Sequence, residues 1–204
     1  CYASRHIAYQ LVQGYYNACP DYTNARTIVL WGANLGHSHP PYMWAAEKAL
    51  KKGARLIVID PRRTAAAREA DLFLQILPGT DAALAWGFAH LLIANGQYAE
   101  SFIANYSLGF EAFKAYAAKF TPEYVASQTG LSTDEIRHLA QLVAEGRPRV
   151  VHYAGISMEH QSNGLNTVRI IAALTGLCGA VDQVGGDIWP QAAPLRNLTL
   201  YDSH

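Results

Sequence analysis

Three short apolar runs alternate with two helix-like segments between residues 27 and 81, and this alternation restricts the fold more than any other feature of the chain. The runs span Thr27–Trp31, Arg55–Ile59 and residues 72–77. They are rich in β-branched and aliphatic residues and show little polar alternation, which is typical of strands buried on both faces of a parallel sheet. The pattern predicts an α/β fold with a Rossmann-like, doubly wound parallel sheet.

A cluster of polar and small residues follows each of these runs. The clusters are residues 32–36 (GANLG), 60–64 (DPRRT) and 78–81 (PGTD). In a parallel sheet all three lie beyond the carboxyl ends of the strands, at the edge where open α/β folds bind ligands. Backbone amides and glycines suit phosphates, carboxylates suit a ribose or a base, and an arginine supplies positive charge. Together the clusters predict a nucleotide site.

Each cluster also has a purely structural explanation. Gly32 could be only a turn residue, and Asp60 could be the N-cap of a helix over residues 64–70. Residues 78–81 could form a turn followed by a helix cap, and at least one of Arg62 and Arg63 could be an ordinary surface residue. Their recurrence after three successive strands favours a shared ligand site over three separate accidents.

The rest of the chain is mostly helical. Residues 82–145 contain no strand-like run, which predicts a helical excursion between the third strand and a fourth at residues 149–153. Two helix starts are well marked: Thr121 precedes Pro122, and Ser132 with Glu135 forms a capping box. Helices are predicted at residues 1–13, 42–52, 64–70, 82–94, 99–106, 109–120, 121–129, 132–145 and 164–175.

Composition narrows the possible partners. The 204 residues are 50% hydrophobic and 16% charged with a formal net charge of zero, which is enough for one globular domain and gives no global attraction to nucleic acid. The chain has no visible signal peptide and no apolar run of membrane-spanning length. Its three cysteines have neither a disulfide pattern nor zinc-site spacing. His37 and His39 could share a metal, but no third ligand lies near them in sequence, which favours hydrogen bonding within the loop.

Six segments of the chain, taken in order, are WGANLGHSHP, GARLIVIDPRRTAAAREAD, LPGTDAAL, FIANYSLGFEAF, TPEYVASQTGLSTDEIRHLA and LTGLCG. Together they resemble the molybdopterin oxidoreductases of the dimethyl sulfoxide reductase superfamily. The resemblance covers nearly all of residues 1–186. It implies that these residues form one of two related α/β domains that each grip one molybdopterin guanine dinucleotide of a molybdenum or tungsten cofactor. Residues 187–204 are then a tail or the start of a following segment.

The resemblance also assigns roles by position. It implies that the phosphates, the guanosine and the pterin are contacted by Gly32, Asn34, Asp60, Arg62, Thr80, Asp81, Gly155 and Ser157. His160 lies in the same loop as Gly155 and is assigned as catalytic. Cys1 is assigned as catalytic and as the metal ligand, because a thiolate is a soft ligand that suits molybdenum or tungsten. The alternative is that Cys1 is merely the residue at which the chain begins.

The segment CYASRH resembles the thiosulfate and polysulfide reductase branch, which implies reduction of a sulfur oxyanion or polysulfide in anaerobic respiration. Catalytic subunits of this family are several times longer. We therefore expect a piece of a longer protein that is inactive alone. The expected partners are the remaining domains of the polypeptide with an iron–sulfur cluster, an iron–sulfur electron-transfer subunit and a membrane anchor subunit, in a prokaryotic periplasmic or membrane-associated complex.

Two alternative functions are also compatible with parts of the sequence. Some relatives of this family serve as structural modules of respiratory complexes without binding molybdenum. The central domain of thiamine-diphosphate enzymes also places an acid after a strand, but it lacks the WGANLG and LPGTD segments and the helical excursion. A thiol at position 1 favours the enzyme over the structural module.

Overall fold

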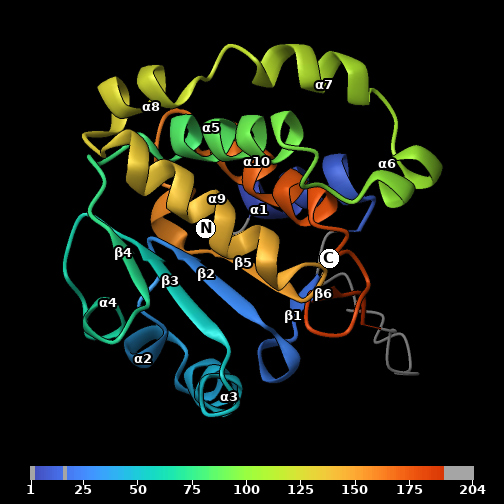
Figure 1. Cartoon of the computed structure of the whole chain (residues 1–204). Helices are drawn as coiled ribbons and strands as arrows, with labels where there is room; N and C mark the ends of the chain where they lie inside the picture. Colours follow the sequence, from blue (N-terminus) through green and yellow to red (C-terminus); the bar gives the residue numbers. More distant parts are fainter. Residues whose placement is uncertain (1–2, 16–17, 191–204) are drawn as a thin grey trace, which may run out of the picture.

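The computed structural model of the chain describes residues 3–15 and 18–190, and it has a parallel sheet between two layers of helices (Figure 1). The four strands are β2 (Thr27–Trp31), β3 (Arg55–Ile59), β4 (Leu72–Leu74) and β5 (Val150–Ala154). They lie in the order β4-β3-β2-β5, and every neighbouring pair is parallel. The predicted doubly wound α/β fold is confirmed.

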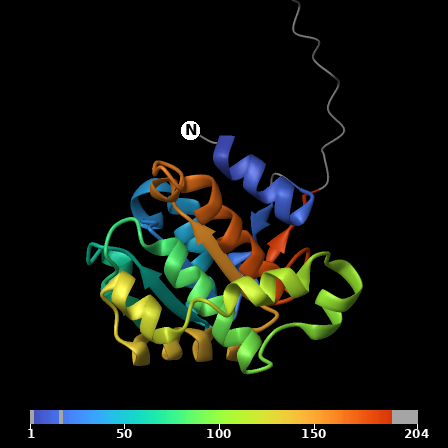
Figure 2. The ribbon, with the colours of Figure 1, turned by 90° about the horizontal axis from the view of Figure 1, so that it is seen from above.

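Helices cover both faces of the sheet (Figure 1). One face carries α2 (Leu35–Ser38), α3 (Pro40–Leu50) and α4 (Ala65–Arg68). The other face carries α1, α5, α9 and α10, and Figure 2 shows α1 lying beside α10. These helices and the excursion between them are α1 (Ala3–Gln13), α5 (Asp81–Ala94), α6 (Glu100–Tyr106), α7 (Phe110–Ala117), α8 (Pro122–Thr129), α9 (Thr133–Gly146) and α10 (Gly164–Leu177). Two 3-10 turns, η1 (Tyr22–Asn24) and η2 (Ile156–Met158), precede β2 and follow β5.

Alternate residues of β2 supply two different cores. Val29 and Trp31 pack with α5, α9 and α10, whereas Ile28 and Leu30 pack with α3 and η1. All four side chains are fully buried. Burying an aliphatic or aromatic side chain of this size stabilises the fold by about 1.5–3 kcal/mol, so a strand with two buried faces favours apolar residues along most of its length.

A buried histidine is accommodated in the larger core without a charge. His152 in β5 is 1% exposed, and the indole Nε1–H of Trp31 donates a hydrogen bond to its Nδ1 at 3.4 Å. Burial lowers the pKa of His152 to about 3, so the ring is neutral and can accept this bond. His152 therefore has a structural role in the larger core.

The predicted helix starts are present. The Ser132 hydroxyl and the Glu135 carboxylate form a reciprocal capping box at the start of α9, and the Thr121 side chain accepts a hydrogen bond from the Tyr124 amide at the start of α8. The third strand is shorter than predicted, because the Leu77 amide leaves the sheet and donates to the Thr129 carbonyl at 3.0 Å. None of the helices in the described part of the chain combines the length and apolar character that a membrane crossing needs.

The sequence did not indicate a second, two-stranded sheet. In it β1 (Cys19–Pro20) pairs antiparallel with β6 (Asp187–Ile188), beyond β5. Two-residue strands carry no periodic signal, and a proline is an unusual strand residue. This pairing attaches Asp187 and Ile188, the first residues of the predicted tail, to the α/β unit. Asp187 is 2% exposed, and the Thr175 hydroxyl donates to its carboxylate at 3.3 Å.

The buried Asp187 predicts a pH-dependent stability. Burial raises the pKa of its carboxyl from 3.8 to about 7, although hydrogen bonds from Gln13 and Thr175 act to lower it. The folded state therefore holds this proton more tightly than the unfolded chain, so the free energy of unfolding should fall as the pH rises from about 4 to about 7 and then level off. Asp187→Asn should remove this decline in the free energy of unfolding, which is on the order of a few kcal/mol. Denaturant unfolding across this pH range measures it, with the exposed Asp134→Asn as the control. An unchanged pH slope in Asp187→Asn would contradict the assignment.

Candidate functional site

The loops that follow β2, β3 and β5 begin side by side at the carboxyl edge of the sheet. The Gly32 amide donates to the Ile59 carbonyl at 2.8 Å, and the Gly155 amide donates to the Trp31 carbonyl at 2.7 Å. The sheet hydrogen bonding thus continues one residue beyond each strand. The chain runs outward from β2 through β3 to β4 and then returns to β5 on the other side, so Gly32 and Gly155 flank the topological switch point of the sheet.

Gly32 and Gly155 approach too closely for side chains. A Cβ on Gly155 would overlap the carbonyl oxygen of Gly32, and a Cβ on Gly32 would come within 2.5 Å of the Ser157 Oγ. Gly32 also has φ +54°, in the left-handed region that favours glycine. The Ser157 hydroxyl donates to the Gly32 carbonyl at 3.1 Å and joins the two loops. The result is a stretch of bare backbone at the switch point, between the ends of β2 and β5.

Asn34 follows this stretch as the N-cap residue of α2. Its carbonyl accepts hydrogen bonds from the amides of His37 and Ser38, each at 3.0 Å. Its side chain makes no capping hydrogen bond. Asn34 therefore lies at the predicted edge, and its carbonyl starts the short helix.

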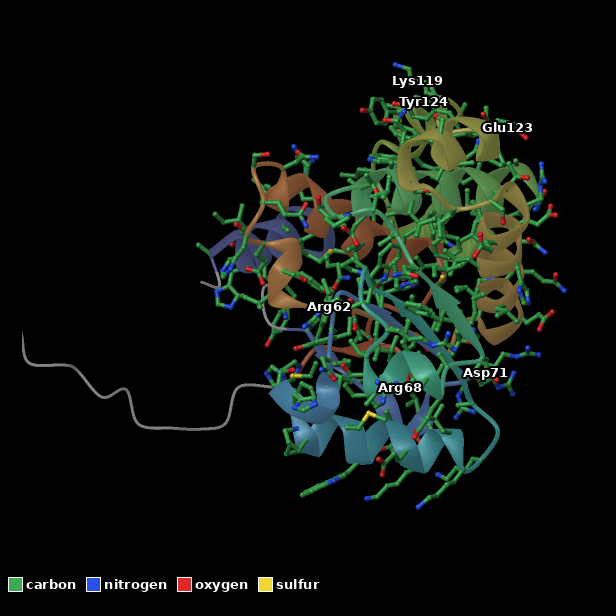
Figure 3. All side chains as sticks on the ribbon, turned by 90° about the vertical axis from the view of Figure 1, so that its left-hand side faces the viewer. Arg62, Arg68, Asp71, Lys119, Glu123 and Tyr124 are labelled. Carbon is green, nitrogen blue, oxygen red and sulfur yellow. The ribbon has the colours of Figure 1, made fainter. Side chains whose placement is uncertain are left out.

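Asp60 organises the loop after β3 in a way that the sequence did not specify. Its Oδ1 accepts a hydrogen bond from the Arg62 amide at 2.7 Å, which forms an Asx-type turn. The residue that caps α4 is Thr64, whose hydroxyl accepts from the Ala67 amide at 3.2 Å, so the alternative of Asp60 as a helix cap is wrong. Figure 3, which faces the ends of the strands, shows Arg62 between the two helical layers. Arg63 instead lies over the ring of Phe73, 5.9 Å from its centroid.

Asp81 lies on the same side of the edge as Asp60. It is the first residue of α5 and only 3% exposed. Burial raises the pKa of the Asp81 carboxyl, a hydrogen bond from its own amide and one from Gln161 lower it, and the charge of Asp60 raises it again. This repulsion means that the two carboxylates share one region. Thr80 is the N-cap residue of α5, but its side chain makes no capping bond, because its hydroxyl donates to the Leu77 carbonyl at 2.7 Å and closes the turn.

Gln161 connects two of these loops, and sequence reasoning missed it. Its Nε2 donates to the Ser157 carbonyl at 3.2 Å, and its side chain also hydrogen-bonds Asp81. Gln161 thereby ties the loop after β5 to the start of α5. The neighbouring His160, which the sequence favoured, has an exposed side chain. No sequence pattern distinguished the amide from the imidazole beside it.

Cys1 lies outside the described residues. The nearest described anchor is Arg5 of α1, which forms an ion pair with Glu159 in the loop after β5. The predicted hydrogen bonding within the histidine loop is present: the His39 Nδ1 lies 3.0 Å from the Ser38 hydroxyl, and the His39 ring stacks on Tyr42 at a centroid distance of 5.4 Å. Residues 3–15 and 18–190 contain no group of three His, Cys, Asp or Glu side chains arranged to hold a metal ion.

Two sizeable cavities lie away from these loops. One, of about 510 Å³, is at the opposite edge of the sheet and is lined by Arg26, Arg55 and Arg149 among others. The other, of about 560 Å³, lies between α5 and α9. The carboxyl edge is identified by its backbone geometry and charges rather than by an enclosed volume.

Comparison with known proteins gives a consistent result. The family model described as "Molybdopterin oxidoreductase" matches residues 1–195. "Probable oxidoreductase YoaE" of Bacillus subtilis (strain 168) is 35% identical over 163 residues, which is 80% of this chain and 24% of that protein. The "F420-dependent formate dehydrogenase 1 subunit alpha" of Methanococcus maripaludis is 30% identical over 174 residues, which is 85% of this chain and 26% of that protein.

A solved structure agrees with the sequence matches. The structure of "Acetylene Hydratase from Pelobacter acetylenicus" superposes with a TM-score of 0.83 at 30% identity, and the match covers 88% of this chain and 24% of that one. The chain thus spans about a quarter of the length of the relatives it matches.

The contact between Gly32 and Gly155 predicts a sharp difference between two glycines. Gly155→Ala places a methyl group against the Gly32 carbonyl, so we expect a loss of about 1–3 kcal/mol of stability or more, as for other overpacked sites. The control is Gly36→Ala in α2, where an added Cβ meets nothing within 4 Å. This control should be neutral or slightly stabilising, because alanine favours helix. Equal melting temperatures for the two variants would contradict the close approach.

Proposed function

The chain belongs to the molybdopterin oxidoreductase family, and we propose that it forms one cofactor-binding domain of a molybdenum or tungsten enzyme. Membership implies a pterin cofactor with one of these metals. We further propose that this domain holds one guanine dinucleotide arm of that cofactor along the carboxyl edge of the sheet.

The observation that carries this proposal is the bare backbone at Gly32 and Gly155, with two carboxylates beside it. The Gly32 and Gly155 amides are bonded within the sheet, but the close contact of the two glycines brings the loop that leads into α2 next to the switch point, and an anionic pyrophosphate favours the backbone amides at such a helix start. Asp60 and Asp81 offer acceptors for the hydroxyls of a ribose or the N–H groups of a guanine. Arg62 offers an exposed positive charge. The donors and acceptors of this edge therefore fit a dinucleotide.

The residues divide the work by position. In the proposed assignment, the phosphates lie beside Gly32 and Asn34, and the pterin lies beside Gly155 and Ser157. The guanosine is held between Asp60, Arg62, Thr80 and Asp81. Gln161 keeps the second and third groups together through its bonds to Asp81 and Ser157. When bound, the cofactor supplies two-electron chemistry at its metal, and the protein supplies binding, orientation and exclusion of water. Cys1 is the proposed metal ligand and His160 a proposed catalytic residue.

The reaction of the whole enzyme is a separate part of the proposal. A relative named as a formate dehydrogenase favours two-electron oxidation of formate. The segment CYASRH favours a sulfur oxyanion or polysulfide, but the relatives named above include no reductase of sulfur compounds, so that expectation gains no support from them. We propose formate first and a sulfur compound second. Assays of the full-length enzyme with formate, thiosulfate and polysulfide separate them.

The remaining parts belong to the rest of the protein. We propose an iron–sulfur cluster outside this chain, together with the second dinucleotide domain, an electron-transfer subunit and a membrane anchor subunit in a prokaryotic complex. The alternative of a thiamine-diphosphate enzyme is wrong, because the family model matches residues 1–195. The alternative of a structural module without metal is decided by experiment.

Metal and nucleotide analysis of the purified full-length protein tests the proposal. We expect molybdenum or tungsten close to one atom per polypeptide and GMP on acid hydrolysis of the cofactor. Absence of both metals would reject the enzyme and favour the structural module. Metal without a guanine nucleotide would retain the pterin enzyme and reject the dinucleotide assignment.

Asp60→Asn in the full-length protein should lower cofactor retention without unfolding the domain. The asparagine carbonyl can still accept the Arg62 amide, so the turn is preserved while the charge is lost. Hydrogen bonds to charged groups contribute about 1.5–3 kcal/mol, which corresponds to about tenfold or more in nucleotide affinity. Nucleotide content after dialysis measures the effect, and the exposed Asp134→Asn is the control. Full retention in Asp60→Asn would remove Asp60 from the site.

A further inference from the structure

A short, buried ion pair joins α1 to the loop after β5. Arg5 Nη2 and Glu159 Oε1 lie 2.9 Å apart, and the side chains are only 13% and 1% exposed. Arg5 Nε donates to Glu159 Oε1 at 3.0 Å, and the Arg5 amide donates to Oε2 at 3.3 Å. Both carboxylate oxygens are therefore held by one residue of α1.

Arg5 also grips the end of β5. Its Nη2 donates to the carbonyl of Ala154, the last residue of that strand, and its guanidinium lies over the ring of Tyr153, 5.5 Å from the centroid. One side chain thus contacts the strand end and the loop that follows it. Glu159 sits between Ser157 and Gln161, so the same loop is fixed to Gly32 on one side and to Asp81 on the other.

A purely stabilising role does not account for this pair. Removing two charges from water costs free energy. A buried ion pair therefore often stabilises a fold no more than an apolar pair of the same shape would. Ion pairs elsewhere in the described part of the chain are more exposed: the side chains of Arg55 and Glu145 are each 45% exposed, and those of Arg137 and Glu123 are 50% and 66% exposed. What a buried, multiply bonded pair supplies is one defined geometry between the two segments that it joins.

The segment fixed in this way leads directly to position 1. Cys1 and Arg5 are four positions apart in the sequence, and a chain of this length spans at most about 14 Å. The partner segment contains Gly155, Ser157 and His160, the loop proposed to face the pterin. The pair therefore links the two parts of this chain that the proposed function brings to the metal.

We propose that Arg5 and Glu159 are positioning residues that hold the start of α1 and the loop after β5 in one register, so that the thiolate of Cys1 and this loop approach the metal from fixed directions. This inference rests on the proposed function. Neither residue touches the reacting atoms in it. They act through Cys1 and through the loop.

Two variants of the full-length enzyme test the inference. Glu159→Gln keeps the shape and removes the charge, and Arg5→Lys keeps the charge and removes the two-pronged contact. We expect metal and nucleotide content close to that of the unmodified enzyme, with altered g-values of the molybdenum(V) or tungsten(V) electron paramagnetic resonance signal. We also expect kcat to fall about ten- to hundredfold with KM nearly unchanged, as for a misplacement of about an ångström.

The matched control is Glu123→Gln, which breaks the exposed pair with Arg137 and should change none of these quantities. An unchanged spectrum and kcat in both Glu159→Gln and Arg5→Lys would overturn the inference. Loss of metal in step with a lower melting temperature in both variants would also overturn it, since a structural role would then be sufficient.

A separate variant distinguishes failure of this inference from failure of the proposed function. Cys1→Ala should retain the dinucleotide, change the metal spectrum and nearly abolish turnover. A normal spectrum and normal activity in Cys1→Ala would show that the metal is held from elsewhere, whatever Glu159→Gln does. An altered spectrum in Cys1→Ala with an unaltered one in the Glu159 and Arg5 variants would retain the ligand and reject only the positioning role.

Discussion

The burial of β2 on both faces is the constraint on which the rest of the structure depends. This strand lies between β3 and β5 and contributes alternate side chains to two separate cores, so a slip by one residue along either neighbour would move each set into the core that is shaped for the other. Its fixed register carries the end of the strand to a fixed place. Gly32 then meets Gly155 at the switch point, and the position of the candidate site follows from the packing of the strand.

The candidate site is formed largely by backbone atoms joined through side-chain hydrogen bonds. Glycine is needed where two of these backbone segments meet. The Gly32 carbonyl receives the Ser157 hydroxyl, the Ser157 carbonyl receives the Gln161 amide group, and Gln161 reaches Asp81. This chain of contacts crosses from β2 through the loop after β5 to α5. A change at any one link would be felt at the others, because each side chain is held by the next.

The sequence predicts the parts of this arrangement that depend on local pattern. The apolar runs predicted the four main strands. The polar residues that follow these runs predicted the sheet edge at which Gly32, Asp60 and Asp81 lie. Contacts between distant segments have no such pattern: Arg5 meets Glu159, and Cys19–Pro20 pairs with Asp187–Ile188, only because the folded chain brings them together. The role of Gln161 was hidden for the same reason. The sequence was compatible with two roles for Asp60, a ligand contact and a helix cap. The hydrogen bond from the Ala67 amide to the Thr64 hydroxyl shows that Thr64 is the cap.

The order of the strands also gives the proposed ligand a direction. Asp60 and Asp81 follow β3 and β4, whereas the glycine backbone lies at the ends of β2 and β5. Two carboxylates would repel a pyrophosphate placed beside them, so the phosphates belong at β2, away from the carboxylates. The N–H groups of a guanine and the hydroxyls of a ribose are hydrogen-bond donors, and they suit acceptors such as Asp60 and Asp81. The dinucleotide would then run from guanosine near β3 and β4, across β2, to the pterin beside β5, where Arg5 and Glu159 fix the loop. In the proposed arrangement, charge separation along the edge, rather than any single residue, would set this orientation.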